Sequence, residues 1–304
     1  MPNLAFDPRF QSVLSLDAAL EPLCTGAVWS EGPVWLEPSQ TLVWSDIPNN
    51  RMLAWNAVHG MTTFRPLSHF SNGNTLDRDG RMVTCEHGRR CVSRTEHDGT
   101  VTVLVDRYQG HRLNSPNDVV VKSDGTIWFT DPSYGIMSDR EGYKADSELD
   151  DHCYVFCFDP ATSALRIVED SFAKPNGLAF SPDEKKLYVT DTSASHDADG
   201  NHHIRVFDMT DDSRLVNGRV FAEVNPGLPD GFRLDSEGRL YVSSEDSIQV
   251  FDPDGTLLGK IPVPEKIANC VFGGTVGNEL FIVASTSLYR IRLNTVGTRR
   301  VRHV

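Results

Sequence analysis

The stretch SPNDVVVKSDGTIWFTDP, residues 115–132, contains the pattern that decides the fold. An apolar run, VVV, is followed by a turn that contains Asp124 and Gly125, and a second apolar run, IWF, ends in Thr130 and Asp131. Two apolar runs separated by an Asp-Gly turn predict a β-hairpin. A polar residue, Asn117, stands just before the first strand of this hairpin.

The pattern occurs six times along the chain. The six strands with a polar end are TLVWSDI from Thr41, RMVTCEH from Arg81, TIWFTDP from Thr126, KLYVTDT from Lys186, RLYVSSE from Arg239 and ELFIVAS from Glu279. Further short strand-like runs bring each repeat to about four strands, and a four-stranded repeat of about 40 to 50 residues is typical of a propeller blade. We therefore expect an all-β protein, a six-bladed β-propeller with four-stranded blades. It should form a single domain over residues 1–304, in which residues 1–25 pack on or close the last blade.

A polar residue also stands 9 or 10 residues before the start of each repeat strand. The six are Glu31, Asn72, Asn117, Asn176, Asp230 and Asn269. The first strand of each blade lines the central channel of a propeller, so these six positions should converge at one rim. Any single Asn-Gly or Asp-Gly pair could be an ordinary turn. Six residues in the same phase favour a shared site.

The chemistry of this predicted ring favours a cation. Two carboxylates, Glu31 and Asp230, would repel each other across a narrow channel unless a cation or a proton separates them. Carboxylate and carboxamide oxygens suit Ca²⁺, Mg²⁺ or Mn²⁺. We expect one divalent ion in the central channel, with Ca²⁺ preferred. Zn²⁺ would favour His or Cys ligands, and His87 is the one nearby candidate.

The strand ends that return to the same rim add a second group of polar residues. They are Asp46, Glu86, His87, Asp131, Asp191 and Ser244. Some of these should orient the ligands or receive substrate hydroxyls, and the alternative is that they only solvate the strand ends. The longest insertion, residues 131–151, follows such an end and is a candidate lid. A second insertion, residues 193–203, has three His and two Asp, and an exposed polar loop is favoured there over a metal site.

Composition excludes several classes of partner. The formal charge is −13, and a short run from Arg299 to Arg302, interpreted as a solvated tail, is the one basic cluster, which argues against nucleic acid. No window is apolar enough for a membrane span, and the N-terminus lacks the features of a signal peptide, so we expect a cytoplasmic protein. The six scattered cysteines are expected to be buried, reduced thiols.

Four strings carry a family resemblance: SPNDVVVKSDGTIWFTDPSYG, KPNGLAFSPDEKKLYVTD, LPDGFRLDSEGRLYVSS and STSLYRIRL. From Glu31 to about Arg292 the chain resembles the family of gluconolactonase, senescence marker protein (regucalcin) and luciferin-regenerating enzyme. The bacterial gluconolactonases are the most similar branch, and diisopropylfluorophosphatase is a more distant relative. Two residues depart from the family's patterns. Ser115 stands where the regucalcin branch has an Arg-x-Asn arrangement, and Ser133 replaces the second Pro of the string DPPYG that is usual in bacterial gluconolactonases.

The resemblance implies specific roles for ring residues. Glu31, Asn176 and Asp230 match metal ligands, Asn117 matches a residue that contacts substrate and in some members the metal, and Asp230 also matches a proton donor or acceptor. It implies a metal-dependent hydrolase that opens small sugar lactones, with a polarised carbonyl attacked by water. No G-x-S-x-G elbow supports a covalent serine mechanism.

Substrate contacts and alternatives complete the prediction. Asn117, Asn72, His87 and Tyr134 are expected to bind the hydroxyls of a small-molecule lactone. A calcium-dependent hydrolase of organophosphates or other lactones is the alternative, followed by a non-enzymatic interaction propeller. We expect no obligatory protein partner.

Overall fold

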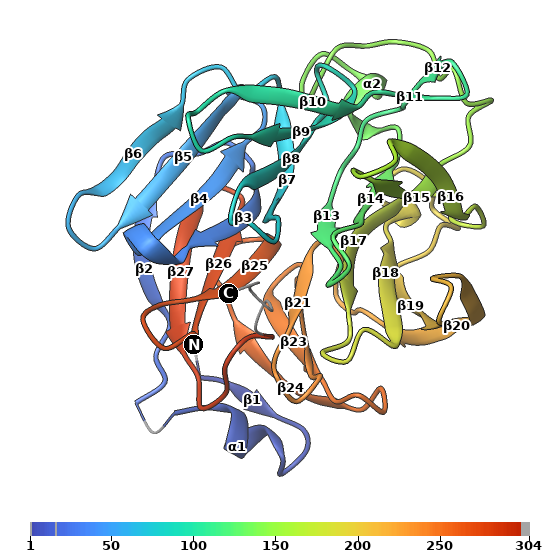
Figure 1. Ribbon diagram of the computed structural model, residues 1–304. Coiled ribbons are helices and arrows are strands. Elements are labelled where there is room, and N and C mark those ends of the chain that lie inside the picture. Colours follow the sequence, from blue (N-terminus) through green and yellow to red (C-terminus); the bar gives the residue numbers. More distant parts are fainter. Residues whose placement is uncertain (1, 16, 299–304) are drawn as a thin grey trace.

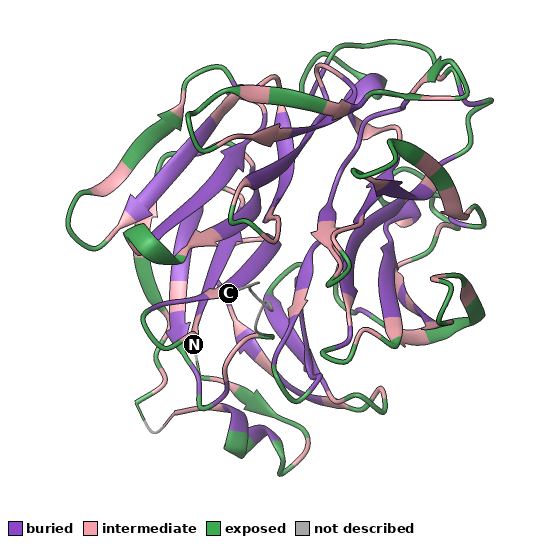
Figure 2. Ribbon diagram, viewed as in Figure 1, coloured by how far each residue is buried: buried purple, intermediate pink, exposed green. Residues whose placement is uncertain are grey.

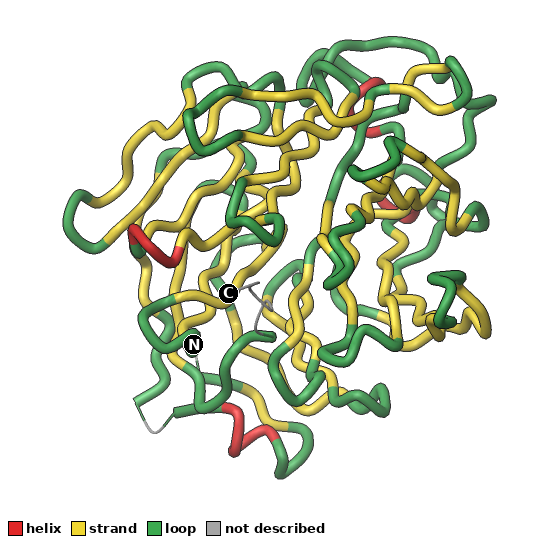
Figure 3. The backbone as a smooth tube through the Cα atoms, viewed as in Figure 1, coloured by secondary structure: helices red, strands yellow, loops and turns green. Residues whose placement is uncertain are grey.

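The computed structural model describes residues 2–15 and 17–298, and in this part of the chain nearly all regular structure is β (Figure 3). Six antiparallel sheets follow one another around a central axis, whose surroundings we call the channel (Figure 1). Each contains four strands in simple up-and-down order, and the fifth sheet gains one more short strand at its edge. The predicted all-β, six-bladed propeller with four-stranded blades is confirmed.

The strands of each blade run from the channel outward in chain order. The blades are β3 (Ser30–Leu36), β4 (Thr41–Asp46), β5 (Arg51–Asn56) and β6 (Gly60–Arg65); β7 (Ser71–Leu76), β8 (Met82–Glu86), β9 (Cys91–Thr95) and β10 (Val101–Val105); β13 (Val119–Val121), β14 (Ile127–Asp131), β15 (Tyr154–Asp159) and β16 (Ala164–Glu169); β17 (Pro175–Phe180), β18 (Lys186–Asp191), β19 (His203–Met209) and β20 (Leu215–Glu223); β21 (Phe232–Leu234), β22 (Leu240–Val242), β23 (Ser247–Phe251) and β24 (Leu257–Pro262); and β25 (Ile267–Gly273), β26 (Glu279–Ala284) and β27 (Ser287–Arg292), joined by β2 (Glu21–Thr25).

The hairpin within residues 115–132 shows how the core forms. Val119 pairs with Phe129 and Val121 with Ile127, so the Asp-Gly turn joins β13 to β14 as expected. Successive side chains of a strand point to opposite faces. Phe129 therefore packs in one apolar cluster and Trp128 in another, and both side chains are fully buried. Because both faces of a middle strand are covered by neighbouring blades, the exposed residues concentrate on outer strands such as β6, β10 and β20 (Figure 2).

The first strands form a closed ring around the channel. The innermost strands β3, β7, β13, β17, β21 and β25 each contact the next, and β25 contacts β3. The N-terminal segment completes the sixth blade: β2 pairs with β27, with Glu21 opposite Arg290 and Thr25 opposite Ser287. The sixth blade thus joins the chain's beginning to its end.

The elements outside the blades are short. β1 (Leu4–Ala5) pairs with β24, and α1 (Phe10–Val13) buries Phe10 and Val13 in the core between the fifth and sixth blades. The remaining elements are the two-stranded ribbon β11 (Arg107–Tyr108) and β12 (His111–Arg112), the helix α2 (Tyr134–Met137), and two 3₁₀ turns at Glu37–Ser39 and Ser193–Ser195.

Three expectations concern chain-wide features. None of the described helices has the length and apolar character that a membrane crossing requires. All six cysteines are free thiols, and five of them are buried. The basic run from Arg299 to Arg302 lies outside the described residues.

Candidate functional site

The six predicted ring residues all lie at the start of an innermost strand. Glu31, Asn72 and Asn176 are the second residues of β3, β7 and β17, Asn269 is the third of β25, and Asn117 and Asp230 stand two residues before β13 and β21. The position just before the strand is thus right for two of the six. In the other four blades the strand begins before the ring residue, because pairing with the second strand continues beyond a register shift, such as the one between Glu31 and Val34.

The glycine after several ring residues explains why the ring is tight. A Cβ atom on Gly32 would lie 1.9 Å from the carbonyl oxygen of Asn72, and one on Gly177 would lie 2.4 Å from that of Asp230. The Gly177 N–H also donates to the Asp230 carbonyl, at 3.2 Å. Only glycine permits such an approach of two backbones. Ring residues of adjacent blades are thereby held side by side.

Buried aspartates at three strand ends fix the segments that lead into the ring. Each carboxylate accepts N–H groups from the residues three and two positions before a ring residue, which replaces hydrogen bonds that the loop lacks. The donors are Val28 (2.9 Å) and Trp29 (3.5 Å) to Asp46, Asn114 and Ser115 (both 2.8 Å) to Asp131, and Ala173 and Lys174 (both 3.3 Å) to Asp191. These three strand ends position the ring backbone.

The other strand ends have local partners. Glu86 accepts hydrogen bonds from Arg89 and Ser93, and Ser244 donates to the carbonyl of Ser247. Their side chains stabilise their own blades.

Glu31 and Asp230 make the ring acidic. Glu31 is 4% exposed, and its Oε2 accepts the Gly32 N–H at 2.7 Å and an Asn269 amide hydrogen at 3.1 Å. Burial and the charge of Asp230 raise the pKa of Glu31 well above its ordinary value. Burial also raises the pKa of Asp230. The negative charges of Glu141 and Asp118 raise this pKa further, whereas the positive charge of Lys266 lowers it. The two carboxyl groups thus interact electrostatically in the channel.

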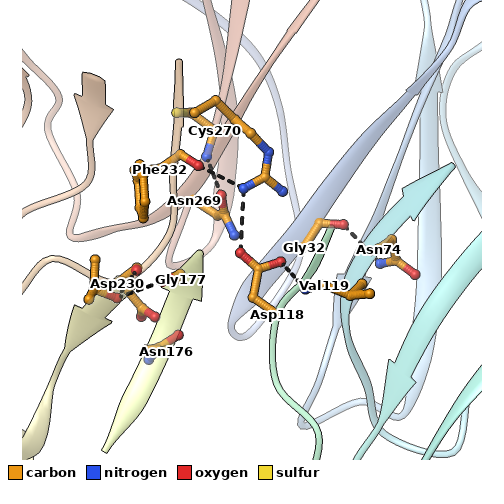
Figure 4. Close-up of polar contacts among 12 residues, drawn as sticks. Gly32, Asn74, Asp118, Val119, Asn176, Gly177, Asp230, Phe232, Asn269 and Cys270 are labelled. Atoms are coloured by element: carbon orange, nitrogen blue, oxygen red, sulfur yellow. Dashed lines mark hydrogen bonds and ion pairs between the residues drawn. The ribbon is translucent and has the colours of Figure 1, made fainter. Parts of the chain in front are cut away.

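A third carboxylate, Asp118, lies next to them and was missed by the sequence reasoning. Figure 4 shows it between the Gly32 side of the channel and the side that carries Asp230 and Asn176. It is 2% exposed, its Oδ1 accepts the N–H of Val119, and its Oδ2 lies 3.4 Å from Nη1 of Arg233. Its position directly after Asn117 in the sequence was the available signal. Nothing in the repeat pattern indicated Arg233.

Asn176 has a partner that sequence reasoning also missed. Its amide Nδ2 donates to the hydroxyl of Thr192 at 3.2 Å, and the hydroxyl of Tyr134 lies 2.6 Å from the same Thr192 oxygen. Tyr134 OH is also 3.1 Å from the hydroxyl of Ser195. The phenol expected to bind substrate therefore joins the segment after β14 to the one after β18. Thr192 directly follows the strand end Asp191, which was the signal.

The remaining predicted contacts lie on the second and third blades. Asn72 is buried, and its amide nitrogen is 3.2 Å from Nε2 of His87. Asn117 is 5% exposed, and its backbone binds Thr130 and Gly73. The structure thus brings Glu31, Asn72, Asn117, Asn176 and Asp230 to one rim, with His87 behind Asn72.

Across residues 2–15 and 17–298, no group of three or more His, Cys, Asp and Glu side chains is placed to hold a metal ion. The predicted ligand set is of a different kind, because it combines just two acids, Glu31 and Asp230, with carboxamides. A metal site in the histidine-rich loop 193–203 has no support either. His196 hydrogen-bonds to Ser195 there, and His202 to the Val224 carbonyl.

Comparison with known proteins places the chain in a family. Residues 29–286 match the family described as SMP-30/Gluconolactonase/LRE-like region. The chain belongs to this family. A gluconolactonase from Xanthomonas campestris has a similar structure, with a TM-score of 0.90 and 42% identity over 96% of this chain and 95% of that one.

Two curated relatives extend the comparison. A gluconolactonase of Zymomonas mobilis is 34% identical over 96% of this chain and 86% of its own length. The pentonolactonase XacC of Haloferax volcanii is 28% identical, covering 84% of this chain and 81% of its own. The resemblance inferred from the sequence strings is confirmed.

Proposed function

We propose that this protein is a metal-dependent hydrolase that opens small sugar lactones. Membership of the family and 34–42% identity to two gluconolactonases over nearly the whole chain support lactone hydrolysis. The observation that carries the site is the pair of carboxyl groups of Glu31 and Asp230, set among carboxamides at one rim of the channel.

The donor chemistry fits a divalent cation. Among the described residues, the charges of Asp230 and Asp118 both act on Glu31, and Arg233 is paired with Asp118. The pair Glu31 and Asp230 is left with carboxamide neighbours and the partly exposed Lys266, a setting in which a bound cation would relieve repulsion. Glu31, Asn176, Asp230 and Asn117 would hold it. Hard oxygen donors favour Ca²⁺, with Mg²⁺, Mn²⁺ and Zn²⁺ as alternatives.

The chemistry divides between this ion and the chain. The cation would supply Lewis-acid polarisation of the lactone carbonyl. Asp230 accepts a proton from the attacking water and later donates it to the ring oxygen, which leaves as the hydroxyl of the open acid. Asp46, Asp131 and Asp191 keep the ring in register during both steps.

Substrate hydroxyls would be bound at the same rim. Asn117 and Asn72 are the proposed direct contacts on the second and third blades, and His87 would contribute through Asn72, because its two ring nitrogens lie 2.9 Å from the Glu141 carbonyl oxygen and 3.2 Å from the Asn72 amide nitrogen. Tyr134 would contribute to substrate binding by its position beside Thr192, because its hydroxyl already contacts the hydroxyls of Thr192 and Ser195. The proposal includes a cytoplasmic location and no obligatory protein partner.

Three measurements test the function. Asp230→Ala should abolish hydrolysis of glucono-δ-lactone while the circular dichroism spectrum keeps its β signature, and a fully active variant would contradict the role of Asp230. Treatment with chelator should remove activity, and Ca²⁺ should restore it. Activity that survives complete metal removal would overturn the metal-dependent mechanism. Running a phosphotriester and an aryl lactone beside gluconolactone decides between this function and the organophosphatase alternative.

A further inference from the structure

A chain of three polar groups connects the segment after β14 to the channel. We call residues 132–153, between β14 and β15, the cap segment. Nδ1 of His87 lies 2.9 Å from the carbonyl oxygen of Glu141 in the cap segment, and Nε2 of the same ring lies 3.2 Å from the amide nitrogen of Asn72. His87 is 1% exposed and Asn72 4%. The imidazole therefore bridges the cap segment and a ring residue without contact with bulk water.

The partners determine where the proton of the imidazole lies. A carbonyl oxygen can only accept, so Nδ1 must carry the hydrogen that binds Glu141. Burial lowers the pKa of His87 to about 4, and the ring is neutral at physiological pH. Nε2 then carries a lone pair and accepts a hydrogen from the Asn72 amide. The orientation of the Asn72 carboxamide is thus set by the cap segment through His87.

This orientation leaves one atom without a partner. Oδ1 of Asn72 is buried and has no hydrogen bond. Asn72 occupies the same strand position as Glu31 and Asn176, one residue before a glycine that packs against the next blade. Its free oxygen therefore belongs to the ring of side chains at the channel rim. An unpaired buried acceptor destabilises the protein, and a ligand that donates a hydrogen bond to it removes this cost.

The cap segment packs closely against the imidazole of His87. A Cβ atom on Gly135 would lie 2.5 Å from Cβ and Cγ of His87, and one on Gly142 would lie 2.0 Å from the carbonyl oxygen of Gly135. The rings of Tyr143 and Phe70 add an edge contact with centroids 5.3 Å apart. Two glycines thus let the cap segment fold back on itself above His87 and bring the Glu141 carbonyl to Nδ1.

We propose that the cap segment, acting through His87, fixes Asn72 as a hydrogen-bond acceptor for a substrate hydroxyl, so that the site selects polyhydroxylated lactones. This inference rests on the proposed function and deepens it. A hydroxyl can donate to Oδ1 of Asn72, whereas a phosphoryl oxygen, an ester oxygen or an unsubstituted methylene cannot. His87 is a positioning residue here, and Asn72 is a specificity-determining one. Substrates without hydroxyls leave the acceptor unpaired and are bound less well.

Kinetics on two substrates test the specificity. The readout is the ratio of kcat/KM for glucono-δ-lactone to that for δ-valerolactone, which has no hydroxyl groups. Asn72→Leu keeps the approximate size and removes the acceptor, and it should lower this ratio about 10-fold or more. A variant in which the ratio equals that of the wild type would overturn the role of Asn72, because a general structural defect lowers turnover of both lactones together.

Two substitutions of His87 form a matched pair. His87→Gln places an amide oxygen near the former Nε2 and can still orient Asn72, whereas His87→Asn can bind Glu141 but does not reach Asn72. The Gln variant should retain a KM for glucono-δ-lactone within about 3-fold of the wild type, and the Asn variant should raise it by about 10-fold. The same KM in both variants would contradict the relay. This comparison uses gluconolactone alone.

A spectroscopic measurement separates the relay from the function. The ¹⁵N chemical shifts of the His87 ring should show a neutral imidazole with the hydrogen on Nδ1 at pH 7, and a hydrogen on Nε2 would overturn the inference. If the protein hydrolyses no lactone, the proposed function fails, and these shifts still decide whether His87 adopts the tautomer that presents a lone pair to Asn72.

Discussion

Arg233 and Asp118, 115 residues apart in the chain, meet in the channel with Nη1 of the guanidinium 3.4 Å from Oδ2 of the carboxylate. Asp118 precedes the innermost strand of the third blade, and Arg233 lies on that of the fifth. The same guanidinium nitrogen donates to the Phe232 carbonyl at 2.7 Å, which keeps it in place. One of the three channel acids is thus balanced by the protein. The remaining pair, Glu31 and Asp230, is available to a cation.

Removing this guanidinium should destabilise the metal-free protein. Arg233→Met leaves Asp118 buried without its partner beside Glu31 and Asp230, and breaking a buried pair in this way costs about 3 kcal/mol. Urea unfolding in the presence of chelator measures the loss. The double variant Arg233→Met/Asp118→Asn removes the unpaired charge and should recover more than half of it. A double variant as unstable as the single one would assign the effect to packing of the Arg233 stem.

Thr192 should control metal affinity from outside the ligand set. Its hydroxyl accepts the Asn176 amide hydrogen at 3.2 Å, so Oδ1 of Asn176 is free to face the channel. Thr192→Val keeps the shape and removes the acceptor, and loss of a group that orients a ligand costs 10- to 100-fold in affinity. Calorimetric titration of the chelator-treated protein with Ca²⁺ should show a weakening of about 10-fold. Thr192→Ser retains the hydroxyl and should bind like the wild type; equal weakening in both variants would point to packing instead.

The fold and the ring could be predicted because both follow from periodicity. Six hairpins with the same turn chemistry predict six blades, and a fixed offset of 9 or 10 residues predicts which side chains meet, from Glu31 to Asn269. Each of those inferences needs only the spacing along the chain. The backbone glycines at positions 32 and 177 agree with them, since inner strands must approach closely.

The partners of the ring could not be predicted in the same way. Arg233 of the fifth blade reaches Asp118 beside the third, past the intervening fourth blade, and the Glu141 carbonyl reaches His87 from an insertion that no other repeat shares. Such contacts depend on side-chain direction and on how one irregular segment folds, and neither has a period. The contacts of the Tyr134 hydroxyl with Thr192 and Ser195 are of the same kind, because no repeat pattern indicates them.

His87 should contribute to the dependence of stability on pH. Its pKa is about 4 in the folded protein, because of burial, and about 6.5 when unfolded. Between these values the unfolded chain binds more protons, so this residue's contribution to the unfolding free energy is complete above pH 6.5 and falls as pH drops toward 4. The change amounts to about 3 kcal/mol. Urea unfolding at several pH values should show a rise for the wild type that His87→Gln reduces by this amount, and parallel curves would contradict it.

Ring closure should depend on β2 far more than on β1. Deleting residues 1–25 uncovers the edge of β27 and removes Phe10 and Val13 from the core between the last two blades. An exposed strand edge favours aggregation, so this variant should lack a cooperative unfolding transition. Deleting residues 1–9 removes β1 and the ion pair between Arg9 and Asp252, whose side chains are 46% and 23% exposed, and such pairs contribute about 1 kcal/mol or less. That shorter deletion should keep a cooperative urea transition and a monodisperse profile in size-exclusion chromatography. If residues 26–304 alone unfold as cooperatively as the full chain, the sixth blade does not need its N-terminal strand.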